Sequence, residues 1–202
     1  MKNDSDKIID LYNRHAQAWV SARLSEAYLY ERGWLEKFCA LVGAKGTILD
    51  LGCGAGEPMA AYLSEHGYSV TGVDSSAAMV SLFQARLPAH HALTADMRQL
   101  ALGRVFHGIL AWDSFFHLNH DDQRRMFAVF QTHAASRAAL MFTSGPTHCE
   151  VIGQLEGELL YHASLSADEY RALLHDHGFD VVETIANDQA CRGRTVWLAR
   201  RQ

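Results

Sequence analysis

The sequence predicts an α/β fold in which strands and helices alternate along the chain. A short aliphatic run, Thr47–Leu51, ends in a glycine-rich turn, and a helix-compatible segment begins at Pro58. Three further short predicted strands lead into Asp74, Asp96 and Trp112. Strands that alternate with helices are typical of βαβ units around a parallel sheet. We therefore expect a ligand site beyond the carboxyl ends of these strands.

The other elements follow from apolar periodicity and capping residues. Helical spacing from about Asp4 to Leu41 predicts one or two helices, with a break at or before Gly33. Further helices are expected from 58, from 76 to 86, over 123–133, and after Ser166, which with Glu169 forms a capping-box pattern. Strands are expected at 47–51, 69–73, 90–94, 104–111, 138–142, 179–185 and 195–199.

Bulk properties predict a single globular domain of 202 residues. The net charge of -5 gives no footprint for nucleic acid. The sequence has neither the apolar run that a membrane span needs nor a signal peptide at its start. The four cysteines are far apart, as expected for reduced thiols of a cytoplasmic protein. We expect a monomer or homodimer with no membrane partner.

The glycine turn contains Gly52, Gly54 and Gly56. A dinucleotide fingerprint counted from Gly52 would require glycine at position 57, where the chain has Glu57. A carboxylate there would repel a pyrophosphate, so a nicotinamide-dependent oxidoreductase is disfavoured.

The alternate glycines, with Asp50 just before them, resemble motif I of the class I methyltransferases that use S-adenosylmethionine, in particular the broad type 11 group. The resemblance covers residues 47 to 200. It implies a Rossmann-like three-layer sandwich around a seven-stranded, mostly parallel sheet with an antiparallel last strand and an N-terminal helical extension. Residues 1–44 would form the helical lid, 45–144 the cofactor-binding core, 145–165 a substrate-side insertion, and 166–202 the final helix and strands.

The resemblance also implies S-adenosylmethionine as cofactor and S-adenosylhomocysteine as product. Asp50 would lie near the ammonium group, Asp74 would bind the ribose, and Asp96 would bind adenine. The other residues expected at the cofactor are Gly52, Cys53, Gly54, Gly56, Ser75, Met97 and Trp112.

The methyl acceptor is expected to be a small molecule that reacts through N or O. The end of the fourth strand lacks the Asn/Asp-Pro-Pro-aromatic run of enzymes that methylate DNA, which disfavours nucleic acid. His117 is the candidate base near neutral pH, with Asp113 as its orienter or as a partner for a substrate ammonium. Substrate contacts are expected from Tyr12, Asp113, Glu158, Tyr161 and His162.

Alternatives remain at this point. His117 could serve only the fold, residues 143–165 could be a solvent-facing hairpin or loop, and the chain could bind S-adenosylmethionine without reacting it. A metal site at His117, His120, Asp121 and Asp122 is not expected, because the two aspartates suit the start of the following helix.

Overall fold

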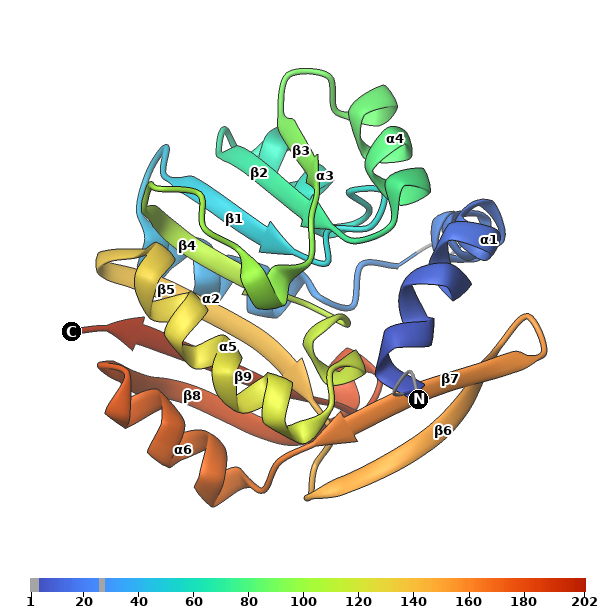
Figure 1. Cartoon of the computed structure of the whole chain (residues 1–202). Coiled ribbons are helices and arrows are strands. Elements are labelled where there is room, and N and C mark those ends of the chain that lie inside the picture. Colours follow the sequence, from blue (N-terminus) through green and yellow to red (C-terminus); the bar gives the residue numbers. More distant parts are fainter. Residues whose placement is uncertain (1–3, 26–27) are drawn as a thin grey trace.

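The computed structural model describes residues 4–25 and 28–202, and the side chains of these residues except 4–6. At its centre lies a seven-stranded sheet in the order β3-β2-β1-β4-β5-β9-β8 (Figure 1). Its strands are β1 (Thr47–Leu51), β2 (Ser69–Asp74), β3 (His91–Thr94), β4 (Phe106–Ala111), β5 (Ala134–Ser144), β8 (Phe179–Asp188) and β9 (Arg194–Arg201). Strand β9 is antiparallel to both β5 and β8, between which it lies. The predicted sheet, with its antiparallel last strand, is confirmed.

Helices cover both faces of this sheet, which gives three layers. The helices are α1 (Asp4–Leu24), α2 (Arg32–Val42), α3 (Met59–Glu65), α4 (Ala77–Arg86), α5 (His120–His133) and α6 (Ala167–Asp176), with short 3-10 turns η1 (Met97–Gln99), η2 (Phe115–His117) and η3 (Gln189–Cys191). One core cluster joins α2, α3 and α4 to the sheet, around Phe38 and Phe83. The other joins α5 and α6 to the opposite face, where Phe127, Tyr170 and Trp197 are buried. The predicted helix break before Gly33 is present, since α1 ends at Leu24.

The segment 145–165 forms a separate two-stranded hairpin, β6 (Cys149–Leu155) and β7 (Glu158–Ser164). The hairpin projects beyond the sheet and lies beside α1 (Figure 1). Ile8 and Leu11 of α1 pack there against Tyr161 and Ala163 of β7. This packing makes the hairpin one of the supports of α1.

Two helix starts differ from the sequence prediction. Ser166 caps α6 by accepting a hydrogen bond from Glu169 N at 3.2 Å, as expected. The Glu169 carboxylate, however, binds Arg124 at 2.7 Å, so the predicted capping box is only half formed. Helix α5 begins at His120, three residues earlier than expected, because Asn119 accepts a hydrogen bond from Asp122 N.

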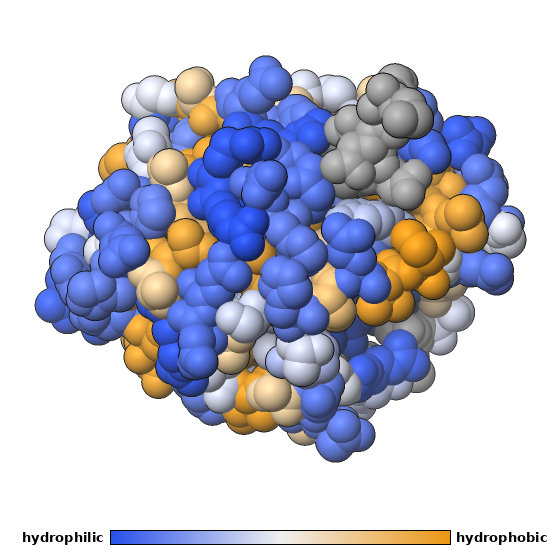
Figure 2. All heavy atoms as spheres, turned by 60° about the horizontal axis from the view of Figure 1, so that its bottom comes forward, coloured by the Kyte–Doolittle hydropathy of each residue, from blue (hydrophilic) through white to orange (hydrophobic). Residues whose placement is uncertain are grey.

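Figure 2 brings the lower side of Figure 1 forward and shows hydrophilic residues over most of this face, with separate hydrophobic areas among them. Val151, Ile152 and Leu159 of the hairpin are among the exposed large apolar side chains. In residues 4–25 and 28–202, no helix combines the length and apolar character needed to cross a bilayer.

Candidate functional site

The glycine turn after β1 is shaped by close packing. Gly52 has φ +74, and a Cβ there would lie 2.2 Å from Cβ of Ser114. The Ser114 hydroxyl donates to the carbonyl oxygen of Leu51 at 2.6 Å, which fixes the contact. A Cβ on Gly56 would instead meet Leu87 at 2.7 Å. Gly52 therefore lets the turn approach the cleft, whereas Gly56 packs on the core and does not line the cleft.

The cleft lies at the carboxyl ends of β1, β2 and β4, beside η1, and α1 forms its other wall. Its empty space, open side included, is about 1030 Å³. The sequence-predicted residues that line it are Tyr12, Asp50, Gly52, Cys53, Gly54, Asp74, Ser75, Asp96, Met97, Trp112, Asp113 and His117. The order of strands reverses between β1 and β4, which is where open α/β sheets bind ligands.

Asp50 is buried at this reversal, with a relative exposure of 3%. No described residue donates a hydrogen bond to its carboxylate. Burial, and secondarily the nearby charge of Asp74, raises the pKa of Asp50 to about 7. A buried carboxylate without a partner is stabilised by a cation, so this end of the cleft favours a positively charged ligand.

Asp74 is held by the backbone around it. Its Oδ2 accepts a hydrogen bond from Gly54 N at 2.9 Å, and its Oδ1 accepts one from Ser76 N at 2.8 Å. Burial raises the pKa of Asp74 despite these bonds. The carboxylate is therefore fixed between the glycine turn and the start of α4, with oxygen lone pairs left for donors in the cleft.

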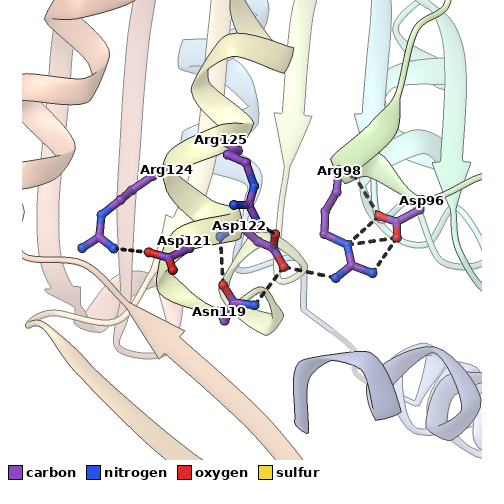
Figure 3. A network of polar contacts seen from close by, with 7 residues as sticks. All are labelled: Asp96, Arg98, Asn119, Asp121, Asp122, Arg124 and Arg125. Carbon is purple, nitrogen blue, oxygen red and sulfur yellow. Dashed lines mark hydrogen bonds and ion pairs between the residues drawn. The ribbon is translucent and has the colours of Figure 1, made fainter. Parts of the chain in front are cut away.

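Asp96 is bound by Arg98, as Figure 3 shows. The guanidinium contacts both carboxylate oxygens, with Nη2 at 2.6 Å from Oδ2 and Nε at 3.0 Å from Oδ1. Arg98 also reaches Asp122, at the start of α5, at 3.1 Å, and Asp122 pairs with Arg125 (Figure 3). Burial would raise the pKa of Asp96, but Arg98 outweighs it and lowers this pKa. The sequence reasoning missed Arg98, although its position two residues after Asp96 was a usable signal.

His117 contacts α1 and the hairpin at once. Its Nδ1 donates to the carbonyl oxygen of Tyr161 at 2.9 Å, and its Nε2 lies 3.0 Å from the hydroxyl of Tyr12. Burial lowers the pKa of His117 to about 4, so the ring is neutral at physiological pH. Burial also raises the pKa of Tyr12 far above its ordinary value, so Tyr12 keeps its proton and donates it to Nε2.

Asp113 does not have the surroundings expected for an orienter of His117 or an ammonium partner. Nε of Arg194 lies 2.9 Å from both of its oxygens, and Nη2 lies 2.6 Å from Oδ2. This bidentate pair already neutralises the carboxylate. The sequence did not indicate this pair, because Arg194 comes from β9, a distant part of the chain that local sequence patterns do not connect to Asp113.

The three hairpin residues predicted to touch substrate are placed differently from one another. A second cavity lies beside the cleft, and of the three residues only His162 lines it. The side chain of Glu158 is 45% exposed, lines neither space, and binds Arg14 and His15 of α1 at 2.5 and 2.6 Å. Tyr161 is buried and also lines neither space. Glu158 and Tyr161 thus make contacts within the fold, and their contact with a substrate stays a prediction.

Metal-ligating side chains do not gather in this region. Within the described part of the chain, no three His, Cys, Asp or Glu residues lie close enough together to hold a metal ion. His120 instead contacts the carbonyl oxygen of Cys149 at 3.1 Å and stacks on His148.

Comparison with known proteins finds a match for part of the chain. Residues 48–136 match the family model described as a methyltransferase domain. This match runs from β1 to the start of β5, which is less than half of the chain. "Putative methyltransferase YqeM" of Bacillus subtilis (strain 168) is 40% identical to it over 70 residues. That match covers 33% of this chain and 27% of the curated protein.

Solved structures of methyltransferases share the fold of this chain. Magnesium protoporphyrin IX methyltransferase of Synechocystis PCC 6803, with bound S-adenosylmethionine, has a TM-score of 0.75 at 17% identity and covers 100% of this chain and 99% of its own. The 1,6-didemethyltoxoflavin-N1-methyltransferase of Burkholderia thailandensis, with bound S-adenosylhomocysteine, has a TM-score of 0.73 at 19% identity, covering 98% and 87%. The class I methyltransferase fold predicted from the sequence is confirmed.

Proposed function

We propose that the protein transfers a methyl group from S-adenosylmethionine to an N or O atom of a small molecule. The observation that carries this proposal is the buried Asp50, which has no hydrogen-bond partner among the described residues and lies near Asp74. Two carboxylates disfavour a phosphate and favour a cation. S-adenosylmethionine carries an ammonium and a sulfonium and no phosphate. A nicotinamide dinucleotide carries a pyrophosphate, and Glu57 would add a third acid against it.

The residues of the cleft fit the parts of this cofactor. Gly52, Cys53 and Gly54 would border the methionine half, and Asp74 would accept hydrogen bonds from the ribose hydroxyls. Asp96 would accept a hydrogen bond from the adenine amine, and Arg98 keeps it ionised for that purpose. When bound, the sulfonium supplies an activated methyl group and a neutral thioether leaving group.

The chain's own contributions to the reaction are alignment, exclusion of water and movement of a proton. Tyr12 and Trp19 of α1 line the cleft together with His117, so α1 closes the site over its ligands. A hydroxyl or amine acceptor loses a proton as its bond to the methyl group forms. Because the Tyr12 hydroxyl occupies Nε2 of His117, we place Tyr12 between acceptor and base: it takes that proton and gives its own to Nε2.

Calorimetry and a labelling experiment test this proposal. We expect S-adenosylhomocysteine to bind and NADH to leave the heat signal unchanged. The protein is then incubated with S-adenosylmethionine labelled with ¹³C in its methyl group and a small-molecule extract, and labelled products are sought by mass spectrometry. Binding without transfer to any component would support a non-catalytic binding module instead. Binding of NADH in place of S-adenosylhomocysteine would contradict the proposal altogether.

A further inference from the structure

The second cavity shares a wall with the cleft. Its empty space, open side included, is about 1670 Å³. Five residues line both spaces: Tyr12, Trp19, Arg23, Asp113 and His117. The second cavity therefore begins where the Tyr12–His117 pair lies and extends away from the glycine turn, between α1, the hairpin and the start of β9.

Aromatic rings follow one another from the cleft into this cavity. Between centroids, the ring of Tyr12 lies 6.4 Å from that of Trp19 and 5.5 Å from that of His117. The His162 ring lies 4.9 Å from that of His117 and 5.0 Å from that of Phe116. The first three rings line both spaces, whereas His162 and Phe116 line the second cavity and not the cleft. A flat aromatic molecule can pack against such a wall through its face or its edge.

The hairpin adds an apolar surface to the same cavity. Its register pairs Val151 with His162 and Gly153 with Leu160, so these four residues share one face of the hairpin. Val151 and Leu160 line the cavity, together with Pro146 just before the hairpin. Walls of this kind bury the body of a small molecule, while a few polar groups set its orientation.

The charged side chains of the cavity leave little to bind a charged ligand. Asp113 is the one carboxylate among the described lining residues, and Arg194 binds both of its oxygens. Arg23 binds Glu31, which is only 1% exposed. Arg192 is exposed, so solvent screens its charge. A ligand charge that leaves water here would have to break one of these pairs or stay without a counterion, and both are costly.

His162 differs from the other imidazole and hydroxyl groups of the cavity. Tyr12 and His117 are bonded to each other, and the hydroxyls of Ser144 and Ser164 donate to backbone carbonyls at 2.9 and 2.8 Å. The His162 ring contacts neighbouring rings, but no hydrogen bond joins it to any described residue. Burial lowers the pKa of His162, so its ring is neutral at physiological pH and offers one donor and one acceptor.

We propose that the methyl acceptor is an uncharged aromatic molecule whose hydroxyl or amino group meets Tyr12 and whose second polar group forms a hydrogen bond with His162. The two groups lie apart on the acceptor ring, because the ring of His117 separates Tyr12 from His162. This inference rests on the proposed methyl transfer and adds the chemical class of its acceptor.

His162 binds the acceptor and takes no part in the proton transfer. The acceptor oxygen or nitrogen forms its bond to the methyl carbon as the carbon–sulfur bond breaks, and sulfur keeps the bonding electrons. The proton of the acceptor passes to Tyr12, and the proton of Tyr12 passes to Nε2 of His117.

Matched probes test the charge of the acceptor and its second polar group. The protein is first saturated with S-adenosylhomocysteine, whose affinity is measured by calorimetry. Two series are then titrated at pH 7: 4-hydroxybenzamide, 4-hydroxybenzoate, 4-hydroxybenzylamine and 4-isopropylphenol, and the four corresponding anilines, in which an amino group replaces the hydroxyl. In at least one series we expect the amide to bind about tenfold more tightly than the acid or the benzylamine, because a charge without a counterion is costly to bury.

Two variants assign the hydrogen bond to His162. His162→Phe keeps a ring and removes both nitrogens. The affinity for the amide relative to its isopropyl analogue should therefore fall about fivefold, the value of one hydrogen bond, while the affinity for S-adenosylhomocysteine stays unchanged. His175→Phe makes the same substitution at an exposed position near the end of α6, outside both cavities, and should leave this ratio intact. Circular dichroism checks that both variants are folded.

Several results would overturn the proposal. These are equal or tighter binding of the acid or the benzylamine in both series, no amide binding up to about 10 mM, an amide-to-isopropyl ratio that survives His162→Phe, or an equal fall of this ratio in His175→Phe. Normal binding of S-adenosylhomocysteine with any of these results would refute the acceptor class alone. Failure to bind S-adenosylhomocysteine would refute the proposed function and this inference together.

Discussion

Asp50 should make cofactor affinity depend on pH. A cationic ligand binds the ionised carboxylate, whose pKa in the free protein is about 7. At pH 6 only about one molecule in eleven is then ionised, so affinity for S-adenosylmethionine should be about tenfold below its plateau. Affinity should rise with pH across this window, up to about pH 7.5, where the ligand's own amine begins to lose its proton.

Calorimetry between pH 5.5 and 7.5 measures this dependence. Repeating the titration in buffers of different ionisation enthalpy gives the protons released, which should be about half a proton per ligand at pH 7. Asp50→Asn should bind more weakly and lose the pH dependence. A flat profile in the wild-type protein, or an unchanged slope in Asp50→Asn, would refute our account of the anionic end of the cleft.

The same carboxylate should lower the stability of the ligand-free fold. Because burial raises the pKa of Asp50 from 3.8 to about 7, the folded state holds a proton that the unfolded state has lost within this window. Stability is therefore lost as pH rises from about 4 to 7, by about 4 kcal/mol in total from this group. Asp50→Asn should flatten that decline in urea unfolding measured without ligand, and a steeper decline in the variant would contradict the argument.

Two further predictions concern the proton pathway and the adenine end. Tyr12→Phe and His117→Ala should each lower kcat, measured at saturating cofactor, by about a hundredfold or more. Because the two residues act as one unit, the double variant should have a kcat little below that of either single variant. If the effects of the two substitutions on kcat multiply in the double variant, the relay is refuted. Arg98→Gln should reduce the preference for S-adenosylhomocysteine over its inosine analogue, which lacks the adenine amine, because Asp96 loses its fixed orientation. Arg125→Gln, which removes a cation paired with Asp122 alone, is the matched control, and an equal loss in both variants would assign Arg98 a purely structural role.

The fold followed from the sequence because its signals are local. The run Thr47–Leu51, the glycines after it and the acid at the end of β2 lie within one βαβ unit, where hydrophobic pattern and turn chemistry set the structure. The carboxyl ends of parallel strands then meet at one edge. For that reason Asp50, Asp74 and Asp96 could be placed at a common cleft without any knowledge of the tertiary contacts.

The acceptor side could not be placed in the same way. Whether Asp113 faces an ammonium or a guanidinium depends on Arg194, which β9 brings beside it from far along the chain. Glu158 was predicted to contact the substrate, yet Arg14 and His15 of α1 bind its carboxylate. These contacts depend on how α1 and the hairpin pack, and periodicity within either segment carries no information about that packing.

Helix α1 is tied to both sides of the opening that it covers. Asn13 accepts a hydrogen bond from Ser76 at the start of α4, while Arg14 and His15 bind Glu158 on the hairpin. A ligand can enter or leave the cleft only when α1 moves away from one of these two contacts. Its hairpin end is an exposed ion pair, which dissolved salt screens. We therefore expect the rate of S-adenosylhomocysteine release, measured by stopped flow, to increase with ionic strength. In Glu158→Gln this rate should not depend on ionic strength.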